Sequence, residues 1–561
     1  MSQLPPKGQG ERRTRLARGR AFASGVVAIT LLAGLLRAVS LDTGLPHWGT
    51  RPDELPVIQH TALPAQGELN LHWSVYPPAY VYASWLWGEL GIRAAQLLGL
   101  LPPGSYVQTL RHHRAAVFLV QRSFSLVAGT AAVLALMLLA RRRLGAALAL
   151  CAGALLATSF LHVRDSHGVK PDVWLSLWVV LALFAMWPLA RRATTGRGVL
   201  AGAAVGMAMG AKYPAVLLLA PLLLAAFLGS QGSGWRRWLP APALVGGLVA
   251  AAVFLATSPS LLVDDSSVGF LSDVLEIVFP QRWIRTLLPA GVTGHTGIAR
   301  IRLPGPGWSS LIYHLRYSLV YGAGLLAALA AAPAVLWGFA QGRRIFPLAA
   351  LTLVTWIAVF SFSPHRYARY LTPVLPLLAL LEAGGLHALA ARLAPHRTGW
   401  VLIGGTLLLA AQPLHDSIAF DRLAGRTDTR VLATRWMKAH LPRRSTVAIM
   451  GTQFWAWGQP ELPPGMVGVG LPRKGDPLHA LRASHARYLL AHHHDRVFSS
   501  TVDPQQMAVL APHLRLLAEF DPGGPGEAWF EPMDAYYIPL HGLCELDRPG
   551  PKIELYAVRK E

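Results

Sequence analysis

Charged residues are scarce in this sequence for a chain of its length. Asp, Glu, Lys and Arg make up 14% of the 561 residues, while hydrophobic residues make up 53% and the mean hydropathy is +0.38. Soluble domains carry about 25% charged residues. Because a chain this long must shelter most of its apolar side chains from water, the composition predicts an integral membrane protein whose shelter is the lipid bilayer.

Cysteine is nearly absent as well. Cys151 lies inside an apolar run, Cys544 lies near the end of the sequence, and there is no CxxC motif. The sequence therefore supports neither a disulfide framework nor a thiolate metal site. Acids are few too, since 29 Asp and Glu stand against 51 Lys and Arg, a formal net charge of +22. The arginines form short clusters between apolar runs, which the positive-inside rule explains better than nucleic-acid binding does.

Long apolar runs, in contrast, are abundant. A helix that crosses a bilayer needs about 20 apolar residues, and eleven runs come near that length, two of them short. The first run follows a basic segment, as in a signal peptide, but no small-residue cleavage site follows it, so we expect a retained membrane helix. The runs lie at 21–40, 115–140, 145–162, 173–190, 198–211, 213–229, 239–257, 311–339, 346–362, 371–390 and 398–412.

The arginine clusters give an independent check on the number of spans. If the basic segment 1–20 is cytoplasmic, the loops after every second span should be basic. All five such loops are basic and contain no acid. They hold Arg141–Arg143, then Arg191, Arg192 and Arg197, then Arg236 and Arg237, then Arg343 and Arg344, and then Arg392 and Arg397. Merging the runs at 198–211 and 213–229 would move the later clusters outside, so the charge pattern favours eleven spans.

We therefore predict a mainly α, multi-pass protein of the bacterial inner membrane with two domains. The transmembrane domain is residues 21–412, and residues 413–561 form a small α/β domain on the periplasmic or extracellular side, because helical and strand patterns alternate there. The outer loops of the transmembrane domain are 41–114, 163–172, 258–310 and 363–370. In the C-terminal domain the expected helices are Thr429–Leu441 and Pro504–Ala511, and the expected strands are Ser445–Met450, Ala486–Leu490 and Lys552–Val558.

Two adjacent acids, Asp53 and Glu54, follow the first span in a chain that has few acids. They could mark no more than the solvated end of a loop. They could also supply chemistry, because removing a proton from a hydroxyl requires a carboxylate base held close to it.

The second outer loop is dense in ionisable groups. Together with the residue before it, the stretch 163–172 contains His162, Arg164, Asp165, His167, Lys170 and Asp172. A polar hairpin tip that reaches water would explain such a loop. Because a turn this short does not need six ionisable groups to remain solvated, we favour a functional site here.

Cations occur at two further places on the outer side. Lys212 stands at a helix break, where it could anchor the interface or bind phosphate as a point charge. Arg366 and Arg369 lie in a segment with His365 and Tyr370, on the side where basic loops are not expected. Arginine suits bidentate phosphate recognition, whereas the plain alternative is a set of interfacial Arg and Tyr side chains.

Several aromatic and histidine residues are weaker candidates. Trp73 and Tyr76 could line a lipid or sugar groove or belong to an interfacial belt, and His167 and His295 join them as groove candidates. Neighbouring histidines on a strand cannot all face one ion, so we expect His492–His494 to form a solvated loop. The spacing of Asp, Glu and His matches no fixed metal template. The metal ligands are therefore unknown, no cofactor is assigned, and a divalent cation is left open.

Taken together, these stretches resemble the type-C glycosyltransferases, and within them the branch of protein O-mannosyltransferases and lipid A aminoarabinose transferases. The resemblance rests on the acidic pair after the first span, the Asp-bearing second loop, the Lys-Tyr break and the Arg-Tyr-Leu-x-Pro motif. The C-terminal motifs are similar to those of bacterial phospholipid carrier-dependent glycosyltransferases. They are Asp421-Arg422-Leu423, Asp428-Thr429-Arg430 and Arg548-Pro549-Gly550-Pro551.

The resemblance implies an inverting transfer of a sugar from a polyprenyl-phosphate donor. The acceptor would be a hydroxyl of a protein, lipid or glycan at the periplasmic face. By match, Asp53 would be the general base, and Glu54 would orient the acceptor or a cation. Asp172, or else Asp165, would be the second acid of the site. Lys170 lies just before Asp172, where the family pattern has small residues, and this departure leaves open which of the two acids carries the role.

The same resemblance assigns the departing phosphate to the cations Lys212, Arg366 and Arg369. A lipid phosphate leaving group needs positive charge beside it, since negative charge develops there as the bond breaks. We therefore expect the corner at 51–54 and the turns 163–172 and 363–370 to converge on one pocket outside the cytoplasm.

Two other functions remain open from the sequence. A transporter or flippase for a lipid-linked or anionic substrate would explain the spans, but it is expected to have paired halves and charges near the midplane. The sequence lacks such halves, and Glu382 in the tenth run is the main intramembrane charge. A non-catalytic scaffold with the outer domain as its binding module is the third reading. The sequence identifies neither sugar nor acceptor, nor the role of the C-terminal domain, nor the oligomeric state.

Overall fold

The computed structural model describes residues 9–231, 238, 240–263, 308–363, 366–450, 457–472, 475–494, 502–524, 530–531 and 534–559. His295 and His365 lie outside the described residues. The chain forms two compact units, each assembled from three segments. Unit 1 comprises Met1–Ala38, Gly67–Ser84 and Ser123–Ser417, and unit 2 comprises Val39–Gln66, Trp85–Arg122 and Ile418–Glu561.

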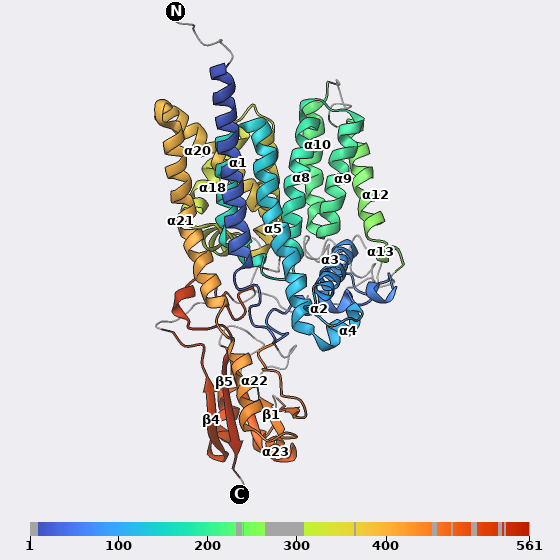
Figure 1. Ribbon diagram of the computed structural model, residues 1–561, viewed down its shortest axis with the longest axis vertical. Helices are drawn as coiled ribbons and strands as arrows, with labels where there is room; N and C mark the ends of the chain where they lie inside the picture. The colour runs from blue at the N-terminus through green and yellow to red at the C-terminus, as the bar shows by residue number, and fades with distance from the viewer. Residues whose placement is uncertain are drawn as a thin grey trace, which may run out of the picture. The chain divides into compact units, whose positions relative to one another are not determined.

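Unit 1 consists of helices, as expected from runs of Ala, Leu and Val separated by short polar or Gly/Pro breaks. Helix α8 packs against α9 and α10, and α9 packs against α12 (Figure 1). Helix α20 contacts α6, α18 and α19. The α-helices that lie wholly or mostly in this unit are α1 (Gln9–Ala38), α5 (Arg114–Leu144), α6 (Ala146–Thr158), α7 (Phe160–Asp165), α8 (Pro171–Arg191), α9 (Thr195–Ala211), α10 (Leu219–Gly229), α12 (Ala241–Thr257), α13 (Ser260–Val263), α16 (Trp308–Tyr313), α17 (Tyr321–Ala323), α18 (Leu325–Phe339), α19 (Ile345–Phe362), α20 (Leu375–Leu393) and α21 (Thr398–Ala424).

Short helical segments of other types join these helices and mark the breaks that the sequence predicts. Lys212 has an extended backbone between α9 and the 3₁₀ helix η2 (Tyr213–Leu218). The 3₁₀ helix η5 (Ala368–Val374) leads into α20, and a π-helical segment, η4 (His314–Val320), precedes α17. Gly324 has φ +99°, a backbone conformation that side chains rarely adopt, and the chain bends by 114° between the helices on its two sides.

Helices α9 and α12 pack with their backbones in contact. Glycines recur every fourth residue along one face of α9, and a Cβ added at Gly202 would lie 2.1 Å from the carbonyl oxygen of Gly246. Such close approach is typical of helix pairs in membranes, where small residues at the interface let van der Waals packing hold the helices together.

All eleven predicted apolar runs coincide with helices in the described part of the chain. Six stretches are long and apolar enough to cross a membrane, or seven if the bent pair around Gly324 counts as one span. The six are Gly19–Ala38, Arg114–Leu144, Pro171–Arg191, Ile345–Phe362, Ala368–Leu393 and Pro395–His440. Shorter apolar helices are Ala146–Thr158, Tyr213–Gly229 and Ala241–Thr257. The multi-pass, mainly helical fold is confirmed, and the number of eleven crossings stays a prediction.

Unit 2 contains a five-stranded mixed sheet in the order β2-β1-β3-β5-β4. Strand β1 is parallel to β2 and β3, and β5 is antiparallel to β3 and β4. Residues of α22 pack on one face of the sheet, and residues of α23 and α24 pack on the other. The elements are α2 (Glu54–His60), η1 (Pro64–Gln66), α3 (Pro78–Leu97), α4 (Tyr106–His112), α22 (Thr429–His440), β1 (Thr446–Met450), β2 (Val467–Gly470), α23 (Pro477–Ala483), β3 (Tyr488–His493), α24 (Pro504–Leu510), β4 (Leu514–Phe520) and β5 (Lys552–Val558).

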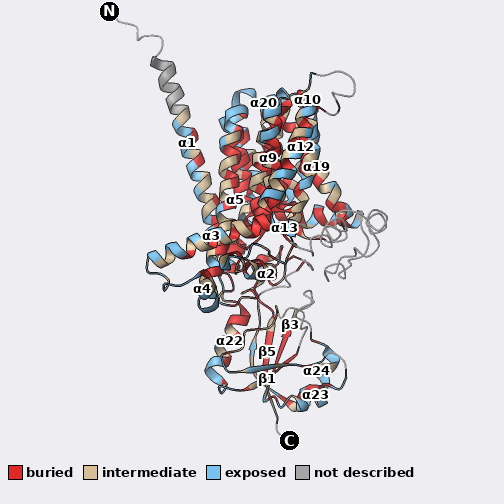
Figure 2. Ribbon diagram, turned by 90° about the vertical axis from the view of Figure 1, so that its right-hand side faces the viewer, coloured by how far each residue is buried: buried red, intermediate tan, exposed pale blue. Residues whose placement is uncertain are grey.

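The C-terminal α/β fold is confirmed, with one correction. The helices α22 and α24 and the strands β1, β3 and β5 were predicted, whereas β2, β4 and α23 were not. His492 and His493 do not lie in a solvated loop but in β3, which Figure 2 shows as largely buried. Burial lowers the pKa of His492 to about 3, with smaller effects from His493 and Arg430. The pairing of β3 between β1 and β5 overrides the polarity of its last residues.

Candidate active site

The stretch that connects α7 to α8 in unit 1 lies in the interior. Every residue from Phe160 to Ser176 is buried, although the stretch contains two acids and four basic or histidine side chains. A hairpin tip that reaches water would expose them, so that explanation of the loop is wrong. Buried charges require partners, and the partners define the site.

Asp165 is fully engaged within this turn. Its Oδ1 accepts hydrogen bonds from Nε and Nη2 of Arg164 at 3.0 and 2.7 Å, and its Oδ2 accepts one from the Thr372 hydroxyl at 2.6 Å. The Lys170 ammonium lies 3.9 Å from Oδ1. Asp165 therefore ties the α7–α8 turn to η5, more than two hundred residues further along the chain.

Asp172 lies in the first turn of α8 and pairs with Lys212. The Lys212 ammonium donates to Oδ1 of Asp172 at 2.7 Å and lies 5.2 Å from the ring centroid of Tyr370 in η5. Oδ2 of Asp172 is buried and has no hydrogen-bond partner among the described residues. Asp172 also lies at the start of a helix, where the helix dipole favours negative charge.

Two arginines of the fourth outer loop lie in or next to η5. Arg366 donates from Nε to the Ser310 hydroxyl at 2.9 Å and from Nη2 to the Ser309 hydroxyl at 2.8 Å. The Arg369 guanidinium lies 4.2 Å from the ring centroid of Tyr367. Both arginines are buried to more than nine-tenths. The α7–α8 turn meets η5 through the bond between Asp165 and Thr372, and Lys212 reaches Tyr370 of η5. The corner at 51–54 belongs to unit 2, so the convergence of all three stretches on one pocket stays a prediction.

An aromatic chain approaches the same helix. Ring contacts of 5.5, 6.1 and 5.9 Å link Trp73 to Tyr76, Tyr76 to Tyr80 and Tyr80 to Trp174, which follows Asp172 by two residues. The Tyr213 hydroxyl, next to Lys212, donates to the carbonyl of Ser74 at 3.0 Å. His167 lies inside the α7–α8 turn, where Nδ1 bonds the Val163 carbonyl at 2.9 Å.

The acidic pair predicted from the first outer loop belongs to unit 2. Glu54 is fully buried, and its two oxygens accept a bidentate pair from Arg122 at 2.9 and 2.7 Å. Arg122 also donates to the carbonyls of Leu41 and Thr43, both at 2.9 Å. Asp53 precedes the first turn of α2 and is partly exposed. The two neighbouring acids thus have different environments, since Glu54 is fully buried and paired with Arg122, whereas Asp53 is only partly buried.

The sequence predicts the acids of the candidate site, but it does not predict the residues that form hydrogen bonds to them. Arg122 and Thr372 were not singled out, yet they hold Glu54 and Asp165. A signal existed for Arg122, because it is a charged residue near the start of the apolar run 115–140. Within the described ranges no group of three or more His, Cys, Asp or Glu could hold a metal ion.

Comparison with known proteins supports the resemblance. Residues 113–262 match the family model of dolichyl-phosphate-mannose-protein mannosyltransferases, and residues 307–425 match that of the Alg9-like mannosyltransferases. The first match contains Asp165, Asp172 and Lys212, and the second contains Arg366 and Arg369. No curated protein matches the chain by sequence.

The fold is similar to that of ArnT from Cupriavidus metallidurans. The structure of ArnT bound to undecaprenyl phosphate has a TM-score of 0.52 at 14% identity, covering 96% of this chain and 98% of ArnT. Its apo structure has a TM-score of 0.50 at 15% identity with the same coverage. The oligosaccharyltransferase of Archaeoglobus fulgidus has a TM-score of 0.46 at 15% identity, over 83% of this chain and 68% of that enzyme. The two partial family matches, together with a fold similar to that of ArnT, support a type-C glycosyltransferase that uses a lipid-linked sugar donor.

Proposed function

We propose that the chain is an inverting glycosyltransferase that moves a sugar from a polyprenyl-phosphate donor to an acceptor hydroxyl at the periplasmic face. The observation that carries this proposal is the buried meeting of Asp172, Lys212 and Tyr370, which come from three separate segments of unit 1. Taking two charges out of water costs several kcal/mol per ion. A chain that only crossed the membrane would gain nothing from that cost. The undecaprenyl phosphate bound by the similarly folded ArnT supports a polyprenyl donor.

The cations suit a phosphate leaving group. Lys212 supplies a compact point charge, and the guanidinium groups of Arg366 and Arg369 supply planar forks that match phosphate oxygens. As the bond between sugar and phosphate breaks, negative charge grows on the phosphate. Groups that bind this growing charge stabilise the transition state more than the ground state, and this difference raises the rate.

Of the two acids in the α7–α8 turn, we assign the role in the reaction to Asp172. Asp165 uses both oxygens to hold Arg164 and Thr372, which suits a residue that shapes the turn. Asp172 keeps one buried oxygen that has no partner among the described residues. That oxygen is available to accept a hydrogen bond from the sugar or to contact a cation.

Asp53 is proposed as the general base. Its carboxylate takes the proton of the acceptor hydroxyl, and the hydroxyl oxygen attacks the anomeric carbon on the side opposite the phosphate, which leaves with the bonding electrons. The configuration at that carbon is inverted. Glu54 then acts through the backbone and not on the acceptor, because Arg122 occupies both of its oxygens and so fixes the start of α2 beside Asp53.

The test is sugar transfer by purified protein in lipid vesicles, measured as release of labelled sugar from a polyprenyl-phosphate donor. We expect Asp53→Asn to lower the rate at least about a hundredfold, the usual contribution of a general base, while the protein keeps its thermal stability. Glu68→Gln is the matched control, because Glu68 is an exposed acid that forms an ion pair with the exposed His72.

Full activity of Asp53→Asn would remove Asp53 as the base. If the wild-type protein moved the intact donor across the vesicle membrane without releasing sugar, the transporter alternative would replace the proposed transfer.

A further inference from the structure

The C-terminal α/β domain bonds the backbone of the first outer loop just before Asp53. All of these residues belong to unit 2. Arg430, at the start of α22, donates from Nη1 to the Gly49 carbonyl at 3.2 Å. Glu461 accepts a hydrogen bond from the Trp48 amide at 3.3 Å on its Oε1. Because both bonds reach the main chain, they fix the path of the loop as it approaches Asp53.

Arg430 holds the loop and the domain in one geometry. Its side chain is fully buried, and it forms a bidentate pair with Asp428 at 2.8 and 2.6 Å. Nη1 is shared between the carbonyls of Gly49 and Trp457, at 3.2 and 2.7 Å, and the guanidinium lies 4.3 Å from the ring centroid of Tyr537. A planar fork with five N–H donors can serve a carboxylate and two carbonyls at once, and an ammonium group lacks that fork.

Glu461 forms the second link between the loop and α22. Its backbone carbonyl accepts a hydrogen bond from the Thr434 hydroxyl of α22 at 2.7 Å, while its side chain holds the Trp48 amide. The loop is closed at this point, since the Thr50 hydroxyl donates to the His47 carbonyl at 2.8 Å and both residues are buried. The domain therefore grips a packed turn that lies directly before Asp53.

We propose that the α/β domain positions the general base: through Arg430 and Glu461 it holds the turn that carries Asp53 to the acceptor hydroxyl. The inference rests on the proposed role of Asp53. A base acts only within hydrogen-bond reach of the proton that it removes, and a displacement of about 1 Å can lower a rate about a hundredfold. Arg430 and Glu461 bond the loop and not the substrate, so both are positioning residues.

The first test is amide hydrogen exchange of the full-length protein in lipid nanodiscs, which does not depend on sugar transfer. Glu461→Leu removes the acceptor of the Trp48 amide, whereas Glu461→Gln keeps a carbonyl oxygen there. We expect the Trp48 amide to exchange about tenfold faster in Glu461→Leu, as for the loss of one hydrogen bond, and at the wild-type rate in Glu461→Gln. Glu519→Leu is the matched control, since Glu519 is an exposed acid of the same domain that pairs with Lys552. Wild-type exchange in Glu461→Leu would overturn the proposal.

Arg430→Lys tests the other link. Its ammonium keeps a positive charge beside Asp428, so the buried carboxylate retains a partner, but it cannot also hold the Gly49 carbonyl in the same geometry. We expect faster exchange of the peptide that contains Gly49 and an unchanged rate in the helices of unit 1. Wild-type exchange of that peptide would exclude Arg430 as a link.

The second test measures sugar transfer. Glu461→Leu should lower kcat about tenfold and leave the KM of the donor unchanged, because the base is displaced while donor binding is not, and Glu461→Gln should keep the wild-type kcat. In an Asp53→Asn background Glu461→Leu should cost nothing further, since no base remains to be positioned. Equal losses in both backgrounds would overturn the proposal. Full activity of Asp53→Asn alone would instead show that the base itself is wrongly assigned.

Discussion

At the scale of single residues, the structure separates acids that look alike in the sequence. Glu54 and Asp165 are buried and fully bonded by Arg122, Arg164 and Thr372. Asp172 keeps a free oxygen among the described residues, and Asp53 keeps contact with solvent. A carboxylate whose oxygens are all occupied holds structure, whereas one with an open oxygen can bind or move a proton. The two classes cannot be distinguished before their partners are known.

The buried pair of Glu54 and Arg122 gives a prediction about stability. Arg122→Met should lower the free energy of unfolding by about 3–5 kcal/mol, because it leaves the buried Glu54 carboxylate without a partner. The double variant Glu54→Leu/Arg122→Met should recover much of that loss. Both are measured by denaturant titration of the detergent-solubilised protein.

The matched control for this pair is Arg93→Met. Arg93 pairs with Glu89 on the helix surface, where its side chain is 65% exposed, and exposed pairs contribute at most about 1 kcal/mol. If Arg122→Met cost no more than Arg93→Met, the buried pair would not be what fixes the start of α2.

At the scale of elements, most helices of unit 1 follow directly from apolar runs and their Gly, Pro or polar breaks. The extended backbone at Lys212 and the start of α8 at Pro171 are predictable from the sequence. The burial of the α7–α8 turn is not predictable, because a polar turn reads as exposed until η5 is seen to cover it. Strands β2 and β4 were missed for a related reason, since β2 is short and glycine-rich and β4 lacks a regular alternation.

The contact of α9 with α12 gives a prediction at this scale. Gly202→Ala should destabilise unit 1 by about 1–3 kcal/mol, because the new Cβ would collide with the Gly246 carbonyl and push the two backbones apart. The measurement is the thermal unfolding of the protein in detergent. Gly247→Ala is the matched control on α12, since nothing lies within 4 Å of its Cβ position. Equal midpoints for the two variants would contradict the packing described.

At the scale of the whole molecule, the number of membrane crossings determines on which side of the membrane the N-terminal segment and the α/β domain lie. An odd number of crossings would place the basic N-terminal segment and the α/β domain on opposite sides, and the arginine clusters predict that the N-terminal segment is cytoplasmic.

The two native cysteines allow a direct test of orientation. Cys544 is exposed in the α/β domain, and Cys151 is buried in α6. A membrane-impermeant maleimide added to the periplasmic side of intact inner membranes should label Cys544 and leave Cys151 unmodified. Cys544→Ser should abolish the signal. Labelling of Cys544 that appears only after the inner membrane is opened would place the α/β domain in the cytoplasm. The prediction of a periplasmic α/β domain would then be wrong.

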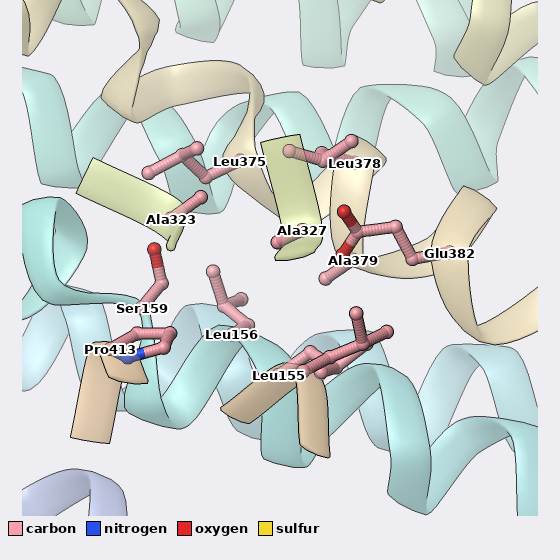
Figure 3. A pocket seen from close by; sticks show the side chains of 11 residues that line it. Leu155, Leu156, Ser159, Ala323, Ala327, Leu375, Leu378, Ala379, Glu382 and Pro413 are labelled. Atoms are coloured by element: carbon pink, nitrogen blue, oxygen red, sulfur yellow. The ribbon is translucent and has the colours of Figure 1, made fainter. Parts of the chain in front are cut away.

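The sequence by itself determined the membrane class, the helical architecture, the α/β character of the C-terminal region and the glycosyltransferase resemblance. These properties follow from composition, apolar length and short local motifs, all of which are written along the chain. Only the tertiary structure decided which acid is bonded by which cation and that η5 meets the α7–α8 turn. It also decided that the α/β domain bonds the loop before Asp53 and that Glu382 lies among mostly aliphatic side chains (Figure 3). Such pairings join residues far apart in the sequence, so they depend on how the helices pack and not on any local pattern.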